Sequence, residues 1–455
     1  MKTKTEDKPA AVGMAGAEKF WPFPKQAGEA RDRWNWVERT VWTKRMLDRL
    51  AQSEGKTVWY SLWDKVWAEG NLNQATLEVV LNHGSAGVDG MSTEQWARQW
   101  SEQVPWLSRQ LRSGEYRPQP VKRTWIEKPG SSEKRPLGVP VVRDRVVQGS
   151  LKHVLEPIFE RDFAEQSYGF RPGRGCLGAL RRVEELLLEG QVWVVDADLK
   201  SYFDTIPHDR LLELIGQRVV DGKVLELIEA FLKAGVMAGM RDWEPTEAGT
   251  PQGGVISPLL ANIYLNPLDH LMAGQGRQMV RYADDLVILC RSAAEAQAAL
   301  GALEKWVTQA GLTLHPTKTR IVNAGDAGGF DFLGYHFERY REGSGSKWYR
   351  KKSGQKLRAS LRALTSRMRS GEMSEIIAEL NPKLRGWYGY FRWSNLIGLA
   401  GVDSWVRRRL RCIQRWRWGR RGASRGRENV ELPNHWFAER GLFSLMAARA
   451  CGSNP

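Results

Sequence analysis

The chain has 455 residues, more than one hydrophobic core usually holds, and carries a formal net charge of +16 with a pI near 9.7. The charge favours a polyanionic partner, either nucleic acid or an anionic membrane surface. The four cysteines lie far apart without a CxxC pair, which argues against a disulfide framework and a structural zinc site. No apolar stretch is long enough to span a bilayer, and the start of the chain lacks a hydrophobic signal core. We therefore expect a soluble cytoplasmic protein with no membrane partner.

The first 340 residues divide into three segments by composition. Residues 1–34 are rich in Lys, Ala, Gly and Pro without apolar periodicity, and are expected to be a mobile leader. In residues 35–115 Trp and Leu recur at helix spacing, which predicts a helical unit with its tryptophans in the core. Residues 116–340 mix short β-rich runs with helical ones and predict an α+β region.

Residues 341–430 hold nearly the whole net charge, with 23 Lys and Arg against 6 Asp and Glu. Trp and Tyr are threaded through the same stretch, as expected where phosphates are neutralised and bases stack. One amphipathic helix is predicted through Leu357, Leu361, Leu364 and Met368, and a second after Asp403. The candidate nucleic-acid contacts of these helices are Arg358, Arg362, Arg407, Arg408, Arg411 and Arg415. A solvated charged face is the alternative for any single helix.

Two apolar runs flank the dipeptide Asp284-Asp285 in residues 277–290, which predicts a hairpin with two acids at its turn. Residues 192–198 form another apolar run, in which Asp196 and Asp198 share one face of a strand because side chains alternate. If the two strands are neighbours, Asp198, Asp284 and Asp285 can share two Mg²⁺ ions, as phosphoryl displacement requires. Alternatively, the pair is a solvated turn and Asp198 or Asp196 caps the next turn.

The run Tyr282-Ala283-Asp284-Asp285 resembles the YxDD signature of reverse transcriptases, in the Ala form typical of group II intron-encoded proteins. Residues 192–208 resemble the first catalytic-aspartate block of that family. The resemblance implies that Asp198 is a metal ligand and that Phe203 is an aromatic gate against ribose. Residues 248–269 resemble the block beneath the incoming nucleotide, with Gln252 as a contact.

Further blocks follow the order of the family. Residues 125–148 resemble the fingers hairpin, which makes Lys128 and Arg135 candidates for binding the triphosphate. Residues 166–176 match another block of the fingers, with Arg171 and Arg174 as implied backbone contacts. Lys318 stands where such polymerases keep a lysine near the pyrophosphate. Residues 378–394 resemble the maturase-specific thumb.

The resemblance covers roughly residues 75–440 and implies an α+β right-hand polymerase fold. Residues 35–115 would extend the fingers, residues 116–340 would form fingers and palm, and residues 341–430 the helical thumb. Residues 431–455 would be a short DNA-binding-like tail without an HNH endonuclease, as in bacterial class C proteins.

The implied function is an RNA-directed DNA polymerase that binds its parent group II intron RNA to promote splicing and mobility in the bacterial cytoplasm or nucleoid. It would use two Mg²⁺ ions, or Mn²⁺ as a substitute, with an RNA template, a DNA primer, dNTPs and target DNA. Three alternatives remain: a domesticated reverse transcriptase in defence or diversity generation, a splicing cofactor without polymerase activity, and a non-enzymatic nucleic-acid scaffold, which would explain the charge but not the acidic residues. Oligomeric state is not predicted.

Overall fold

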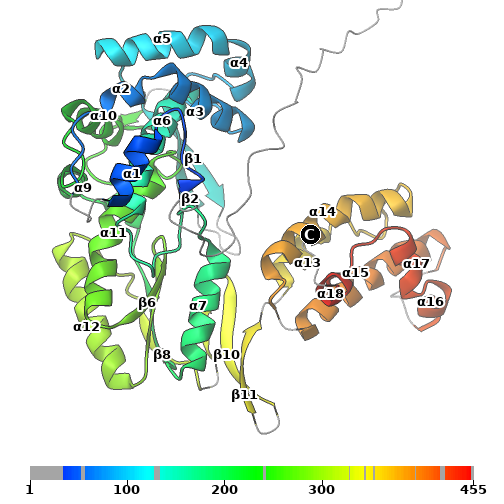
Figure 1. Cartoon of the computed structure of the whole chain (residues 1–455). Helices are drawn as coiled ribbons and strands as arrows, with labels where there is room; N and C mark the ends of the chain where they lie inside the picture. The colour runs from blue at the N-terminus through cyan, green and yellow to red at the C-terminus, as the bar shows by residue number, and fades with distance from the viewer. Residues whose placement is uncertain are drawn as a thin grey trace, which may run out of the picture.

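The computed structural model describes residues 34–52, 57–127, 134–238, 242–326, 328–342, 345–351, 354–394, 396–420 and 426–451. The predicted leader therefore lies almost wholly outside the described residues. Mixed helices and strands, followed by a helical C-terminal unit, confirm the predicted α+β class (Figure 1). No helix in the described ranges has the length and apolar content that a bilayer crossing needs.

Helices dominate the N-terminal part, and a small sheet follows them. The helices are α1 (Lys44–Gln52), α2 (Trp63–Val66), α3 (Glu69–Leu81), α4 (Thr93–Arg98), α5 (Trp100–Ser113) and α6 (Val142–Glu160). The sheet has the strand order β2-β1-β4-β5, with β1 (Val121–Glu127), β2 (Lys134–Val139), β4 (Val236–Met237) and β5 (Trp243–Glu244). The predicted tryptophan stripe is largely internal, because Trp59 is buried and Trp63 and Trp67 pack against the same core.

The central sheet has the strand order β6-β7-β3-β8, with all neighbours antiparallel. Its strands are β3 (Trp193–Asp198), β6 (Gln278–Tyr282), β7 (Asp285–Cys290) and β8 (Arg320–Asn323). The helices of this region are α7 (Cys176–Leu188), α8 (Tyr202–Thr205), α9 (His208–Gly216), α10 (Gly222–Leu232), α11 (Ser257–Gly274) and α12 (Ala293–Gln309).

Alternation along β3 assigns its side chains to two different cores. Val195 and Ala197 join the core that contains α11 and α12, whereas Val194 joins the core that contains α7. Asp196 and Asp198 share the parity of Val194, so they belong to the α7 face. Helix α12 begins after Ser292, whose hydroxyl accepts a hydrogen bond from the N–H of Glu295 at 3.2 Å.

A third sheet connects the central sheet to the C-terminal helices, with β9 (Phe330–Phe332), β10 (Tyr335–Glu342) and β11 (Gly345–Lys351) in the order β11-β10-β9. In Figure 1 the β10–β11 hairpin projects beside α7. The Tyr335 hydroxyl donates to the carbonyl of Tyr390 at 2.7 Å, and the Tyr390 hydroxyl donates to the carbonyl of Leu333 at 2.7 Å. These reciprocal bonds join the C-terminal helices to the sheet.

The C-terminal unit has a core of its own. Its helices are α13 (Gln355–Leu361), α14 (Met373–Phe391), α15 (Leu396–Arg417), α16 (Gly426–Glu431), α17 (Asn434–Glu439) and α18 (Leu445–Ala450). Leu432, Phe437 and Leu445 are buried in this core, so part of the predicted C-terminal tail packs with the helices that the sequence predicts as a thumb.

The first amphipathic helix is shorter than predicted. Helix α13 ends at Leu361, and Met368, expected on its apolar face, is 78% exposed. Arg409 donates to the Thr365 carbonyl at 2.6 Å and to its hydroxyl at 3.1 Å, which holds the chain in turns after α13. The second helix, α15, is present and buries Val406, Leu410 and Ile413, whereas Trp416 is 45% exposed.

Candidate active site

Two of the three predicted carboxylates face each other across neighbouring strands. Asp198 is the last residue of β3 and Asp285 the first of β7, and the antiparallel register pairs them directly. The predicted hairpin is present, with Ala283 and Asp284 as its two-residue turn between β6 and β7. Ala283 has φ +57°, the left-handed region that L-residues with a Cβ seldom adopt. The hairpin thereby brings Asp284 and Asp285 to the end of the strand that carries Asp198.

The three carboxylates affect one another electrostatically. Partial burial, followed by the charges of Asp284 and Asp198, raises the pKa of Asp285 to about 6. Burial and the charge of Asp198 also raise the pKa of Asp284, while Arg135 and Lys318 act in the opposite direction. Crowded carboxylates of this kind favour a cation in their midst.

A hollow of about 440 Å³ lies over this end of the sheet. Its charged lining residues are Asp196, Asp198, Asp285, Lys318, Arg320 and Asp331. Lys318 forms an ion pair with Asp198, and its predicted contact with the pyrophosphate stays a prediction. Asp196 pairs with Arg320 at 3.3 Å, so its charge has its own partner.

Three carboxylates supply hard oxygen donors, which suit Mg²⁺. In the described part of the chain, however, no three His, Cys, Asp or Glu side chains are already gathered closely enough to hold a metal ion. The Asp198 carboxylate is turned to Lys318 instead. The oxygen donors of the three carboxylates and the raised pKa values of Asp284 and Asp285 fit a divalent cation. Binding of this cation by Asp198 would require Lys318 to leave its ion pair with Asp198.

The predicted nucleotide contacts Phe203 and Gln252 lie on two segments that are hydrogen-bonded to each other. Phe203 is half-buried, and its carbonyl accepts a hydrogen bond from the N–H of Thr250 at 2.6 Å. Gln252 donates to the Asp204 carboxylate at 3.3 Å. A Cβ on Gly253 would lie 2.5 Å from the carbonyl oxygen of Gly138, so this loop packs directly against β2. Strand β2 therefore lies against the 249–253 loop, which is hydrogen-bonded to the segment that carries Phe203.

Of the two predicted triphosphate contacts, only Arg135 is described. Arg135 is exposed on β2, and its charge partly opposes the rise that burial causes in the pKa of Asp284 and of Asp204. That influence indicates that the guanidinium lies near the carboxylates. Lys128 lies outside the described residues.

The prediction that Arg171 contacts nucleic acid is wrong. Its side chain is 1% exposed, forms an ion pair with Glu160 at 2.8 Å and donates to the carbonyls of Ala164 and Ser167. A guanidinium enclosed in this way binds the protein's own chain and is withdrawn from phosphates. Arg174 is half-buried and pairs with the exposed Glu165, so its nucleic-acid contact stays a prediction.

The predicted thumb arginines fall into two groups. The nucleic-acid contact predicted for Arg411 is wrong, because this residue is only 6% exposed. Its side chain donates to the Leu432 carbonyl at 2.9 Å and to Asn434 at 2.9 Å. Arg415 is mostly buried in an ion pair with Glu428, and Arg407 lies 3.9 Å from Asp403. Arg362 and Arg408 are exposed, and Arg358 is half-buried.

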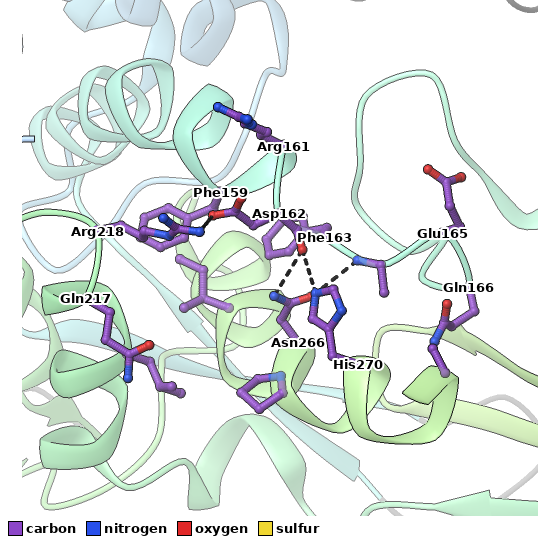
Figure 2. A pocket seen from close by; sticks show the side chains of 15 residues that line it. Phe159, Arg161, Asp162, Phe163, Glu165, Gln166, Gln217, Arg218, Asn266 and His270 are labelled. Carbon is purple, nitrogen blue, oxygen red and sulfur yellow. Dashed lines mark hydrogen bonds and ion pairs between the residues drawn. The ribbon is translucent and has the colours of Figure 1, made fainter. Parts of the chain in front are cut away.

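A second hollow, of about 790 Å³, lies away from the acids. It is lined by the 161–166 loop, the end of α9 and one side of α11 (Figure 2). Asn266 and His270 of α11 both donate to the carbonyl of Asp162 there, at 3.3 and 2.8 Å, and Arg218 pairs with the Asp162 carboxylate at 2.5 Å. None of the predicted site residues lines this hollow.

Residue-by-residue analysis of the sequence missed Arg281 and Asp269. Both are fully buried, and Arg281 donates to the carbonyl of Ala283 in the acidic turn at 3.0 Å. The sequence signal for Arg281 was its position inside the apolar run of β6, because a buried charge needs a partner of opposite charge.

The raised pKa of Asp285 predicts a pH dependence of stability in metal-free protein. In the folded chain the Asp285 carboxyl stays protonated up to about pH 6, whereas the ordinary pKa of an Asp side chain is 3.8. Between these values the folded state binds more protons than the unfolded state, so stability falls as pH rises. We expect Asp285→Asn to unfold at a higher temperature than the wild type above pH 6 in EDTA, with the difference vanishing near pH 4. Equal unfolding temperatures at pH 7 would contradict this expectation.

A carboxylate pair on a hairpin, beside a third acid on the adjacent strand of an antiparallel sheet, is the palm arrangement of template-directed nucleic-acid polymerases. Residues 126–337 match the family model described as reverse transcriptase (RNA-dependent DNA polymerase). Residues 354–429 match the model described as group II intron, maturase-specific domain. The chain belongs to the group II intron-encoded reverse transcriptase and maturase family, which confirms the resemblance.

Individual relatives match over different lengths. The group II intron-encoded protein LtrA of Lactococcus lactis subsp. cremoris is 43% identical over 168 residues, which are 37% of this chain and 28% of LtrA. Protein YkfC of Escherichia coli (strain K12) is 34% identical over 295 residues, 56% of this chain and 76% of YkfC. A chain of a solved partial Cas6-RT-Cas1–Cas2 complex is 26% identical, with a TM-score of 0.35, and the match covers 55% of this chain and 41% of that one. This chain thus spans little more than a quarter of LtrA.

Proposed function

We propose that this protein copies RNA into DNA and also binds the RNA of its parent group II intron. The pairing of Asp198 with Asp285 across β3 and β7, next to Asp284, is the observation that carries the polymerase activity. Primer extension tests it, with a DNA primer on an RNA template, dNTPs and Mg²⁺. We expect incorporation that EDTA abolishes. No incorporation by a chain that still binds RNA would leave the splicing-cofactor alternative.

The carboxylates of Asp198, Asp284 and Asp285 would hold two divalent cations, Mg²⁺ with Mn²⁺ as a substitute. Such ions neutralise the phosphates and make a primer 3′-hydroxyl more acidic. Lys318 stands beside Asp198 and can give a proton to the departing pyrophosphate. Arg135 would bind the triphosphate, together with Lys128. Gln252 would line the nucleotide site above Asp204.

Phe203 would exclude ribonucleotides by collision with the 2′-hydroxyl. We expect Phe203→Ala to lower the preference for dNTPs over rNTPs at least about tenfold, measured as the ratio of kcat/KM values, since steric exclusion of a small group has about this effect. Tyr202→Phe is the matched control, because it retains the neighbouring ring and alters only a buried bond to the Ala261 carbonyl. Unchanged sugar discrimination in Phe203→Ala would remove the gate role.

The C-terminal helices would bind intron RNA through charge and stacking. Arg362 and Arg408 are exposed, and Trp393 and Trp418 are partly exposed under arginine side chains. The bound RNA would fold for splicing, and the complex would insert the intron into target DNA by target-primed copying in the bacterial cytoplasm or nucleoid. A splicing assay with the intron that surrounds the gene tests this role, and a gene outside any intron would favour the domesticated alternative.

A further inference from the structure

Arg281 lies on β6, three residues before the first acid of the hairpin, and its side chain is 0% exposed. Its ion-pair partner Asp269 lies on α11 and is also 0% exposed. Burying two charges is costly, and hydrophobic residues of similar volume often stabilise a core as well or better. The position of this pair therefore calls for an explanation beyond stability.

Each of the five N–H donors of the Arg281 guanidinium has an acceptor. Nε donates to Asp269 Oδ1 at 2.7 Å, and Nη2 donates to Asp269 Oδ2 and to Ser167 Oγ, the latter at 2.8 Å. Nη1 donates to Asn262 Oδ1 at 3.0 Å and to the Ala283 carbonyl at 3.0 Å. One side chain thus joins α11, the 166–169 loop and the turn that carries the acids.

The backbone strengthens this connection. The N–H of Arg281 donates to the Gln166 carbonyl at 2.9 Å, and the Arg281 carbonyl accepts from the N–H of Tyr168 at 2.8 Å. Asn262 donates to the carbonyl of Gly169 at 2.8 Å. A Cβ on Gly169 would lie 2.4 Å from the nitrogen of Ala283, so the loop is pressed against the turn.

The turn needs such support, because Ala283 holds a left-handed conformation that costs about 1 kcal/mol or more for a residue with a Cβ. Its carbonyl bond to Arg281 fixes the peptide that leads into Asp284. We propose that Arg281, anchored by Asp269, is a positioning residue that holds the Ala283–Asp284 turn so that Asp285, the first residue of β7, stays opposite Asp198. This inference rests on the proposed polymerase function of the same site.

A purely structural ion pair and a positioning pair respond differently to removal of both charges. Arg281→Met alone leaves Asp269 buried without its partner and is expected to lower both stability and activity. The double variant Arg281→Met/Asp269→Leu removes both charges and should recover most of the unfolding temperature. It cannot restore the bond to the Ala283 carbonyl, so we expect kcat for primer extension to stay about 100-fold low, the effect of a displacement of about 1 Å.

The conservative variant Arg281→Lys tests whether the planar guanidinium with its five donors is needed. A lysine keeps the charge but offers three donors in place of five, so kcat should fall while KM for template and primer changes little. Asn71→Ala is the matched control, because Asn71 is fully buried and bonds the Lys65 carbonyl and Ser150 far along the chain from the turn. It should lower stability without a matching loss of kcat.

Amide hydrogen exchange separates this inference from the proposed function. In the double variant the amides of Ala283, Asp284 and Asp285 should exchange at least about tenfold faster than in the wild type, at equal global stability. This readout does not need polymerase activity, so an inactive wild-type chain would refute the function and still test the turn. Recovery of both wild-type kcat and wild-type exchange in the double variant would overturn the positioning role.

Discussion

Replacing Asp198, Asp284 or Asp285 with alanine is expected to lower dNTP incorporation at least about 1,000-fold, which is about 4 kcal/mol of activation free energy. Each of these variants removes a carboxylate from the set that would hold the divalent cations. Primer extension on an RNA template, measured in single-turnover conditions with Mg²⁺, gives the rate. RNA affinity should remain within about twofold, because the C-terminal helices that carry the positive charge are unaltered.

Asp209→Ala is the matched control, because Asp209 is an exposed carboxylate in the first turn of α9. Its rate should equal that of the wild type. Asp196→Asn is informative as well: Asp196 shares the strand and face of Asp198 but pairs with Arg320, so a modest effect is expected. Full synthesis by any of the three alanine variants would remove that residue from the proposed site.

The double variant Arg362→Gln/Arg408→Gln is expected to bind intron RNA about 100-fold more weakly. A hydrogen bond to a charged group contributes about 1.5 kcal/mol, so each phosphate that is no longer bound should raise Kd roughly tenfold. Both side chains are exposed. Arg409, next to Arg408 on α15, donates to the carbonyl of Arg362 at the end of α13 at 3.4 Å, so α13 and α15 meet at this point. Filter binding over a salt series measures the affinity.

Salt dependence distinguishes direct binding of phosphates from indirect effects. If two phosphates are no longer neutralised, the slope of the logarithm of the RNA association constant against the logarithm of the salt concentration should decrease in magnitude by roughly 1.4 to 1.8. The control Arg98→Gln/Arg109→Gln removes the same charge from exposed positions on α4 and α5 and should change neither the slope nor the affinity by more than a small factor. An unaltered slope in the thumb variant would show that these arginines do not contact RNA phosphates.

Local patterns in the sequence are enough to predict several features of this protein. The hairpin of β6 and β7, the strand β3 with Asp196 and Asp198 on one face, and the helix α15 all follow from apolar periodicity and turn residues within short windows. The resemblance of the run Tyr282-Ala283-Asp284-Asp285 to the YxDD signature indicated the reverse transcriptase family, and the family models match the chain. These features are legible because each is encoded by residues that are close together in the chain.

Which charged groups face solvent and which are internal follows only from the folded arrangement of distant segments. Arg171 and Arg411 look no different in the sequence from exposed arginines, yet each is enclosed by acceptors from other segments, such as Glu160 and the Leu432 carbonyl. The order β6-β7-β3-β8 likewise places Asp198 against Asp285 although 86 residues separate them in the printed sequence. Burial and strand pairing arise from contacts between segments that are far apart in the chain, and no local pattern carries that information.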